Sequence, residues 1–175
     1  LQPSFSHRAS RDALPLMVAA TRQALDRWAR QAASFAVDDA LTALTVDIIT
    51  RLLFSRDAGS ASPQVRHAVH TLLAEINSEF YRPLTLPDWL PWNRERREAR
   101  RLLLNMIQSR VQERLASDAK DWPDDLLSRL LHLHIADPVA WTSQDVLDEC
   151  MTAFLAGHET LAATLVWWIW CMASH

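Results

Sequence analysis

The sequence predicts an all-α protein of 175 residues that forms a single domain. The chain has only two glycines, which leaves little scope for tight hairpins or glycine-rich phosphate loops. Hydrophobic residues make up 49% and charged residues 22%, which is typical of a soluble globular domain with a sizeable core. Apolar side chains recur at helical spacing in six segments. The net charge of −3 shows no bias toward nucleic acid.

Three helices are predicted before residue 80. The first covers Arg11–Ser34, and one apolar side of it consists of Leu14, Met17, Val18, Leu25 and Trp28. The second runs from Asp38 to Phe54 and begins with two aspartates, whose carboxylates suit a helix N-terminus. The segment SRDAGSAS then forms a loop. The third helix begins at Pro63, because proline is favoured in a first turn, and reaches about Phe80.

The middle of the chain is predicted as a connector followed by two helices. Pro83, Pro87 and Pro91 exclude a regular helix in YRPLTLPDWLPW. The fourth helix covers about Asn93–Ser117, and its opening NRERREARR is interpreted as a solvated face rather than a nucleic-acid patch. The fifth is DDLLSRLLHLH. His132 and His134 are two residues apart and point to different sides of that helix, so no metal pair is expected.

The sixth helix has the clearest predicted start. Thr142 is an N-cap candidate with Asp145 three residues later, which resembles a capping box. No proline follows, so the helix continues to about Ser174. A helix of roughly 33 residues is about 50 Å long and crosses a whole domain. We therefore expect it to be the central element against which the others pack.

Two sides of this helix differ in side-chain size. One side consists only of small residues and forms a shallow trench: Thr152, Ala153, Ala156, Gly157, Thr160, Ala163 and Thr164. The opposite side is predicted to fill the core with Phe154, Leu155, His158, Leu161, Leu165 and Trp168. Glycine inside a helix costs about 1 kcal/mol relative to alanine, and a close approach to the backbone is the usual reason. Either a tightly packed helix or a flat, planar cofactor explains the trench.

Polar residues within the apolar stretch indicate a candidate catalytic site. Glu159 is a charge among apolar neighbours, where an unpaired carboxylate is costly. Thr160 can bond back to the Ala156 carbonyl and bend the helix. Together they could hold a water or pass a proton. HETLA lacks the second histidine of a zinc protease because Ala162 stands there, and no nucleophile elbow supports a serine or cysteine triad.

The two cysteines do not predict a disulfide. Cys150 and Cys171 lie on the same predicted helix, roughly 30 Å apart. We expect both to be buried, inert thiols in a reducing, cytoplasmic setting. The longest apolar run, Leu161–Ala173, is shorter than the roughly 18 residues of a membrane span. The opening LQPSFSHRAS has no signal-peptide pattern and no initiator methionine, so the chain is expected to be an excised piece.

The stretch AGHET at residues 156–160 resembles the cytochrome P450 superfamily of haem-thiolate monooxygenases. Their distal helix carries the motif Ala/Gly–Gly–x–Asp/Glu–Thr–Thr/Ser, and Leu161 departs at its last position. LTVDIITRLLF, LPDWLPWNRERREARRLL and DDLLSRLL resemble further family segments in the same order. The resemblance covers essentially the whole chain. It implies a partial P450 fold, helices D to I, with a long central I helix.

The resemblance also implies what the chain lacks. The family's cysteine loop, F-x-x-G-x-x-x-C-x-G, does not occur, and the E-x-x-R pair that the family carries on its K helix does not occur after the AGHET stretch. Residues 1–175 are therefore expected to be a single incomplete domain without the axial metal ligand. Haem belongs to the parent protein under this interpretation. The 175-residue piece alone is expected to lack haem and to be inactive.

The resemblance assigns roles residue by residue. Ala156, Gly157 and Thr160 would contact the haem, and Glu159 and Thr160 would be the catalytic pair that delivers protons. Ala153, Leu155 and Ala156 would border the substrate. Because Leu161 replaces a Thr or Ser of the family motif, the relay has one hydroxyl fewer, which predicts less efficient proton delivery.

The implied parent protein uses haem and O2 to hydroxylate a small apolar substrate, with electrons from a redox partner. Neither nucleic acid nor a membrane span is expected in this segment. The alternative class is a non-catalytic helical interaction module derived from the same fold. In either case the ridge LVWWIW predicts self-association, because Trp167, Trp168 and Trp170 span more than one side of the last turns.

Overall fold

The computed structural model describes residues 7–31, 34–55, 63–79 and 93–175, and within these ranges it contains helices and no strand. The α-helices are α1 (His7–Ala29), α2 (Val37–Phe54), α3 (Pro63–Glu79), α4 (Arg94–Leu115), α5 (Leu126–Ala136) and α6 (Ser143–Ser174). A short 3₁₀ turn, Ala119–Asp121, precedes α5. The all-α prediction is confirmed for these ranges. Residues 56–62 of the predicted loop and the whole Trp-bearing connector at 81–92 lie outside them.

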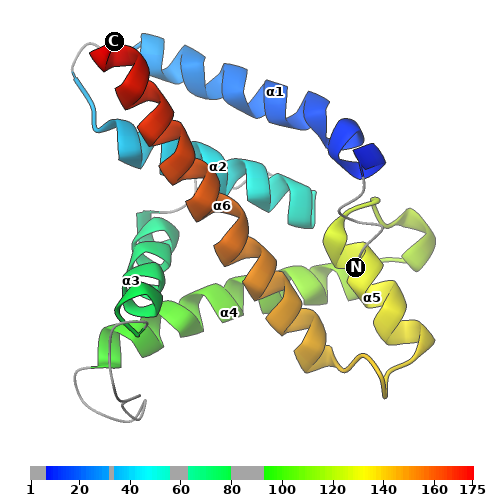
Figure 1. Cartoon of the computed structure of the whole chain (residues 1–175). Helices are drawn as coiled ribbons and strands as arrows, with labels where there is room; N and C mark the ends of the chain where they lie inside the picture. Colours follow the sequence, from blue (N-terminus) through cyan, green and yellow to red (C-terminus); the bar gives the residue numbers. More distant parts are fainter. Residues whose placement is uncertain (1–6, 32–33, 56–62, 80–92) are drawn as a thin grey trace.

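The long helix α6 runs diagonally across the molecule (Figure 1). Its main packing partner is α2, and it also packs on α4 and α5, whereas α1 packs on α2 and α3 packs on α4. The start of α6 is the predicted capping box. The Thr142 hydroxyl accepts a bond from the Asp145 amide, and the Thr142 amide donates to the Asp145 carboxylate at 2.8 Å. The prediction of one unbroken helix from Ser143 through Ala173 is confirmed.

The first helix differs from its prediction at its end and in its buried face. It ends at Ala29 instead of Ser34, because Arg30 and Gln31 bond three residues back and tighten the last turn. The buried residues of α1 are Ala20 and Ala24. Three residues of the predicted apolar side are exposed, namely Leu14, Val18 and Leu25. The alanines let α1 lie close to Leu44 and Ile48 of α2, so the larger side chains are left outside that contact.

The main core lies where α2, α3, α4, α5 and the first half of α6 meet. Its fully buried side chains include Leu103 and Ile107 of α4, Leu127 and Leu130 of α5, and Phe154 of α6. The exposed opening of α4 is confirmed as a solvated face, with Arg94 and Glu98 paired at 2.8 Å in solvent. Helices α4 and α5 therefore contribute to the core through their buried apolar side chains and not through the charged opening of α4.

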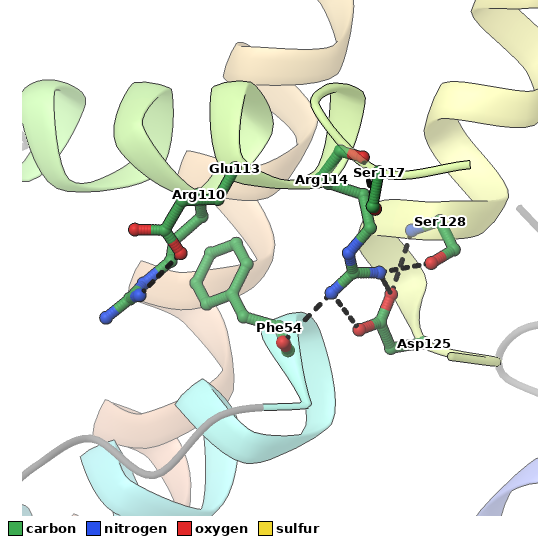
Figure 2. Close-up of polar contacts among 7 residues, drawn as sticks. All are labelled: Phe54, Arg110, Glu113, Arg114, Ser117, Asp125 and Ser128. Atoms are coloured by element: carbon green, nitrogen blue, oxygen red, sulfur yellow. Dashed lines mark hydrogen bonds and ion pairs between the residues drawn. The ribbon is translucent and has the colours of Figure 1, made fainter. Parts of the chain in front are cut away.

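An arginine fastens three of these helices at one buried point (Figure 2). Arg114 of α4 forms two bonds with the Asp125 carboxylate, at 2.7 and 2.8 Å, and one with the Phe54 carbonyl at 3.0 Å. It also bonds the Ser128 hydroxyl. Asp125 in turn caps α5 by accepting a bond from the Ser128 amide at 2.8 Å. The side chains of Arg114 and Asp125 are only 10% and 2% exposed.

The two histidines of α5 are structural, as predicted. His134 donates from Nδ1 to the Trp141 carbonyl at 2.6 Å, and its Nε2 lies 3.3 Å from the Ser143 hydroxyl. His132 packs its ring on Trp122. The contacts of His134 tie the end of α5 to the start of α6. Among the described residues, no group of three histidine, cysteine or acidic side chains could hold a metal ion.

Candidate functional site

The buried side of α6 consists of residues that are four positions apart in the sequence. Val146, Cys150, Phe154, His158 and Ala162 are all buried. The predicted core-filling side is confirmed at Phe154 and His158, and Leu155 and Leu165 are half-buried. It is wrong at Leu161 and Trp168, which are 42% and 58% exposed. A step of four residues turns through about 40° more than a full helical turn, so the covered stripe winds around the helix and away from those two residues.

The small-residue side of α6 is largely uncovered. Six of the seven predicted trench residues are exposed: Thr152, Ala156, Gly157, Thr160, Ala163 and Thr164. The seventh, Ala153, is half-buried. The helices of the described ranges therefore leave this side of α6 open. It presents alanine methyls and threonine hydroxyls along about three turns of helix.

Gly157 marks the edge where α2 meets this open side. A Cβ atom on Gly157 would lie 2.7 Å from the Ile49 Cδ1 atom of α2, which is closer than carbon atoms pack. The close approach that the sequence predicted is thus made by a neighbouring helix. Ala153 packs against the main core, and the other five residues of the trench are exposed. A tightly packed helix therefore accounts for Gly157 at the edge of the trench.

Thr160 bonds within the helix as the sequence predicted. Its hydroxyl donates to the Ala156 carbonyl at 3.2 Å, and the Thr164 hydroxyl donates to the Thr160 carbonyl at 2.7 Å. The helix nevertheless continues through this turn without a break. The oxygen of Thr160 lies on the open side and keeps its lone pairs available as acceptors.

Glu159 and Leu155 lie between the open and the covered sides. Glu159 is half-buried and lies close enough to His158 for their charges to interact. Leu155 is half-buried one turn earlier and packs against the main core. The helix therefore places the predicted acid and the predicted hydroxyl of Thr160 on adjacent sides of one turn. Ala156 and Thr160, four residues apart, share the open side.

His158 is a polar residue of this region that was predicted only as a core-filling side chain. It is fully buried, and its Nδ1–H donates to the Phe154 carbonyl at 2.8 Å. Its Nε2 atom is buried and has no hydrogen-bond partner. Burial lowers the pKa of this imidazole, so the neutral ring is favoured. The only signal in the sequence was its spacing of four from the apolar Phe154 and Ala162.

The cysteines differ from each other. Cys150 is buried as predicted, and burial raises the pKa of its thiol to about 12. Cys171 is exposed, so the prediction of two buried thiols is wrong for this residue. It lies in the last turns of α6, beyond the part that other helices cover. Neither cysteine forms a disulfide. Within the described ranges, no helix combines the length and apolar character that crossing a bilayer requires.

The whole chain, residues 1–175, matches the family model described as Cytochrome P450. This chain belongs to the cytochrome P450 family. The protein named cytochrome P450 135A1 of Mycobacterium tuberculosis is 31% identical over 99% of this chain. A cytokinin hydroxylase of Arabidopsis thaliana is 27% identical over 98% of it. The solved structure of retinoic acid-bound cyanobacterial CYP120A1 matches 93% of the chain with a TM-score of 0.70 at 23% identity.

The P450 fold accounts for the arrangement of the six helices. The chain spans 38% of the length of the mycobacterial relative and 35% of the solved chain. Helices α1 to α6 correspond to helices D to I of the family, with α6 as the long I helix. The residues AGHET therefore lie on the helix where the family carries this motif. The predicted resemblance is confirmed at the level of family and fold.

Proposed function

We propose that this chain forms the distal wall of the haem pocket in a P450 monooxygenase. The observation that carries the proposal is the uncovered side of α6, on which Ala156 and Thr160 lie together beside Glu159. The reaction class converts a C–H bond, O2, two electrons and two protons into an alcohol and water. An apolar organic substrate and an electron-donating partner complete the proposal.

The residues of this side suit a planar group on steric grounds. Alanine, glycine and threonine side chains leave the helix backbone accessible, so a flat ring can approach it closely. The open side carries neither cysteine nor histidine, so it can serve as a wall and not as the source of an axial ligand. Haem, when bound, supplies the oxygen activation, while the protein supplies orientation and proton control.

The proposed roles of this chain follow from chemistry at named atoms. The Thr160 oxygen holds a water on the open side through its lone pairs. The Glu159 carboxylate takes a proton from solvent and passes it to that water. Ala156 and Gly157 would line the cofactor, with Ala153 and Leu155 along the substrate. Leu161 is exposed and cannot replace the missing hydroxyl of the motif, so proton transfer relies on Thr160.

The relay is tested in the full-length protein with haem and its electron donor. We expect Glu159→Gln and Thr160→Ala each to lower product formation by about 10²-fold, because each removes a proton-transfer group. Thr160→Ser keeps the hydroxyl and is the matched control, which should retain most activity. The fraction of consumed electrons that appears in product is measured beside the rate. Equal activity of Thr160→Ala and Thr160→Ser would refute the proposed relay.

The isolated 175-residue chain is proposed to be inactive and to bind no haem through a thiolate. Cys150 is buried with a pKa of about 12, so its thiol stays protonated near neutral pH. Cys171 lies on the same helix as the proposed distal wall. Reconstitution with haem, followed by reduction under carbon monoxide, tests this. A Soret band typical of thiolate ligation would contradict it.

A helical interaction module remains the second candidate. Trp167, Trp168 and Trp170 are 65%, 58% and 57% exposed, which is unusual for three indoles within one turn of a helix. Self-association of the isolated chain through this surface is part of the proposal. We also propose a reducing, cytoplasmic location, which the two unpaired thiols support. If the full-length protein formed a dimer and had no redox activity, the interaction module would be favoured.

A further inference from the structure

A pocket of about 410 Å³ lies between α2, α3 and α6, away from the centre of the open side. Its apolar wall includes Val69 and Leu73 of α3 and Val166 of α6. Ala156, Gly157 and Thr160, the residues proposed to line the haem, do not line it. The volume lies within the range of small-molecule sites, which combine apolar walls with a few polar groups.

One buried acceptor in the wall of this pocket has no partner. His158 lines the pocket and is fully buried, and its Nδ1–H is committed to the Phe154 carbonyl. The ring is therefore fixed as the tautomer whose Nε2 carries a lone pair and no hydrogen. That atom is buried and unbonded. A buried acceptor without a donor is destabilising, so the site calls for a ligand with an N–H or O–H group.

The other polar groups of the pocket indicate the charge of that ligand. Asp38, in the first turn of α2, and Glu159 both line the pocket and carry carboxylates. No lysine or arginine is among the described residues that line it, and its remaining polar groups are Thr42 and His70. The indole of Trp167 forms part of the wall, and an aromatic face attracts a cation. Acceptors and negative charge around apolar surface favour a cationic donor over a neutral or anionic one.

We propose that the α2–α3–α6 pocket binds a small organic ammonium ion, with one N–H directed at His158 Nε2. Its apolar body would lie against Val69, Leu73 and Val166, and its charge would face the carboxylates of Asp38 and Glu159. This site adjoins the proposed haem wall and shares Glu159 with the proposed proton relay. It does not depend on the monooxygenase proposal, since the test needs neither haem nor turnover.

The test uses the 175-residue chain with ¹⁵N-labelled histidine at about pH 8, where imidazoles are mostly neutral and alkylammonium ions keep their charge. Benzylammonium is titrated, and benzyl alcohol serves as its neutral analogue. We expect the His158 Nε2 resonance to move saturably upfield with benzylammonium, as its lone pair gains a donor, while Nδ1 stays in place. The alcohol should bind at least about fivefold more weakly, because it lacks the charge.

Two substitutions locate the site. His158→Leu removes the acceptor and should weaken benzylammonium binding at least about tenfold. Asp38→Asn should weaken it about two- to fivefold, whereas Asp39→Asn, in the same turn but outside the pocket, should leave it unchanged. If His158→Leu does not fold, the proposal is tested by comparing Asp38→Asn with Asp39→Asn and by the titration of the unaltered chain.

Three results would overturn the proposal. The first is equal affinity for benzylammonium and benzyl alcohol, which would remove the role of charge. The second is binding without any movement of the His158 Nε2 signal. The third is an Nε2 signal that already has a hydrogen-bonded position in the free chain and does not respond to the amine, which would show that water alone fills the pocket.

Discussion

The two halves of α6 differ in what covers them. In the first half, Cys150 and Phe154 are fully buried against α2, α4 and α5. In the second half, Trp167, Trp168 and Trp170 stand more than half exposed. The same helix thus passes from a closed core to an open surface within about five turns. Apolar composition alone does not explain this difference, because the exposed half is the one richer in large aromatic side chains.

The difference is explained by what lies beside each half. At the closed end, Arg114 joins α4 to the end of α2 and to the cap of α5, which holds three helices around α6 (Figure 2). No comparable buried ion pair is found beside the second half within the described ranges, where most residues of α6 are exposed. A helix that belongs to a larger fold shows, by its uncovered residues, where further structure or a ligand is placed.

The largest expected effect is at the closed end. Arg114→Met should lower the free energy of unfolding by about 3–5 kcal/mol, because it leaves the Asp125 carboxylate buried without its partner. Urea unfolding followed by circular dichroism measures this change. Arg94→Met is the matched control, since its pair with Glu98 lies in solvent, and it should not shift the midpoint. Equal midpoints for the two variants would show that the buried pair does not fasten the closed end.

A smaller effect is expected at the open end. Trp168→Ser should weaken self-association of the isolated chain about tenfold, since a single aromatic residue often dominates an interface. The same change should alter the free energy of unfolding of the dilute chain by less than about 0.5 kcal/mol. Light scattering and sedimentation measure the association. A clean monomer at high concentration would contradict the expectation.

The smallest effect concerns acid stability at the boundary between the halves. Burial lowers the pKa of His158, so the unfolded chain takes up a proton at this ring before the folded chain does. The contribution of the neutral His158 ring to the free energy of unfolding is fully present above the ordinary histidine pKa of about 6.5. It is lost as the pH falls below that value. Glu159 and His70 are the charged neighbours, and they act in opposite directions.

The pH effect is measured by unfolding the chain between about pH 8 and pH 5. His158→Leu should flatten the fall in stability below pH 6.5, because it removes the ring that must be protonated. His132→Gln, on an exposed histidine of α5, is the control and should leave the profile unchanged. An unaltered acid profile in His158→Leu would contradict the assignment.

Features determined by neighbours in the sequence were predictable. The cap at Thr142 and the proline-free run of α6 are local, and the structure contains both. The motif at residues 156–160 gave the family. The Arg114 site was not predictable, because its partners Asp125 and Phe54 lie 11 and 60 residues away. A pairing at that distance leaves no periodic signal in one sequence.

Burial was mispredicted where it depends on which helix comes close. Leu14 and Leu25 of α1 looked like core residues, but α1 approaches α2 through alanines and leaves the leucines outside. Leu161 and Trp168 failed for a different reason, since the covered stripe of α6 drifts around the helix. Gly157 was correctly singled out as a point of close approach, but the sequence could not say that Ile49 would be the neighbour.

The central claim is that the open side of α6 faces a haem in the full-length protein. The most direct test is the rate at which the reduced, haem-loaded protein binds carbon monoxide after Ala156→Phe. We predict a rate at least about tenfold slower, because the new ring occupies the open side. Ala116→Phe, on an exposed residue at the end of α4, should bind carbon monoxide at the original rate. An unchanged rate in Ala156→Phe would contradict the account.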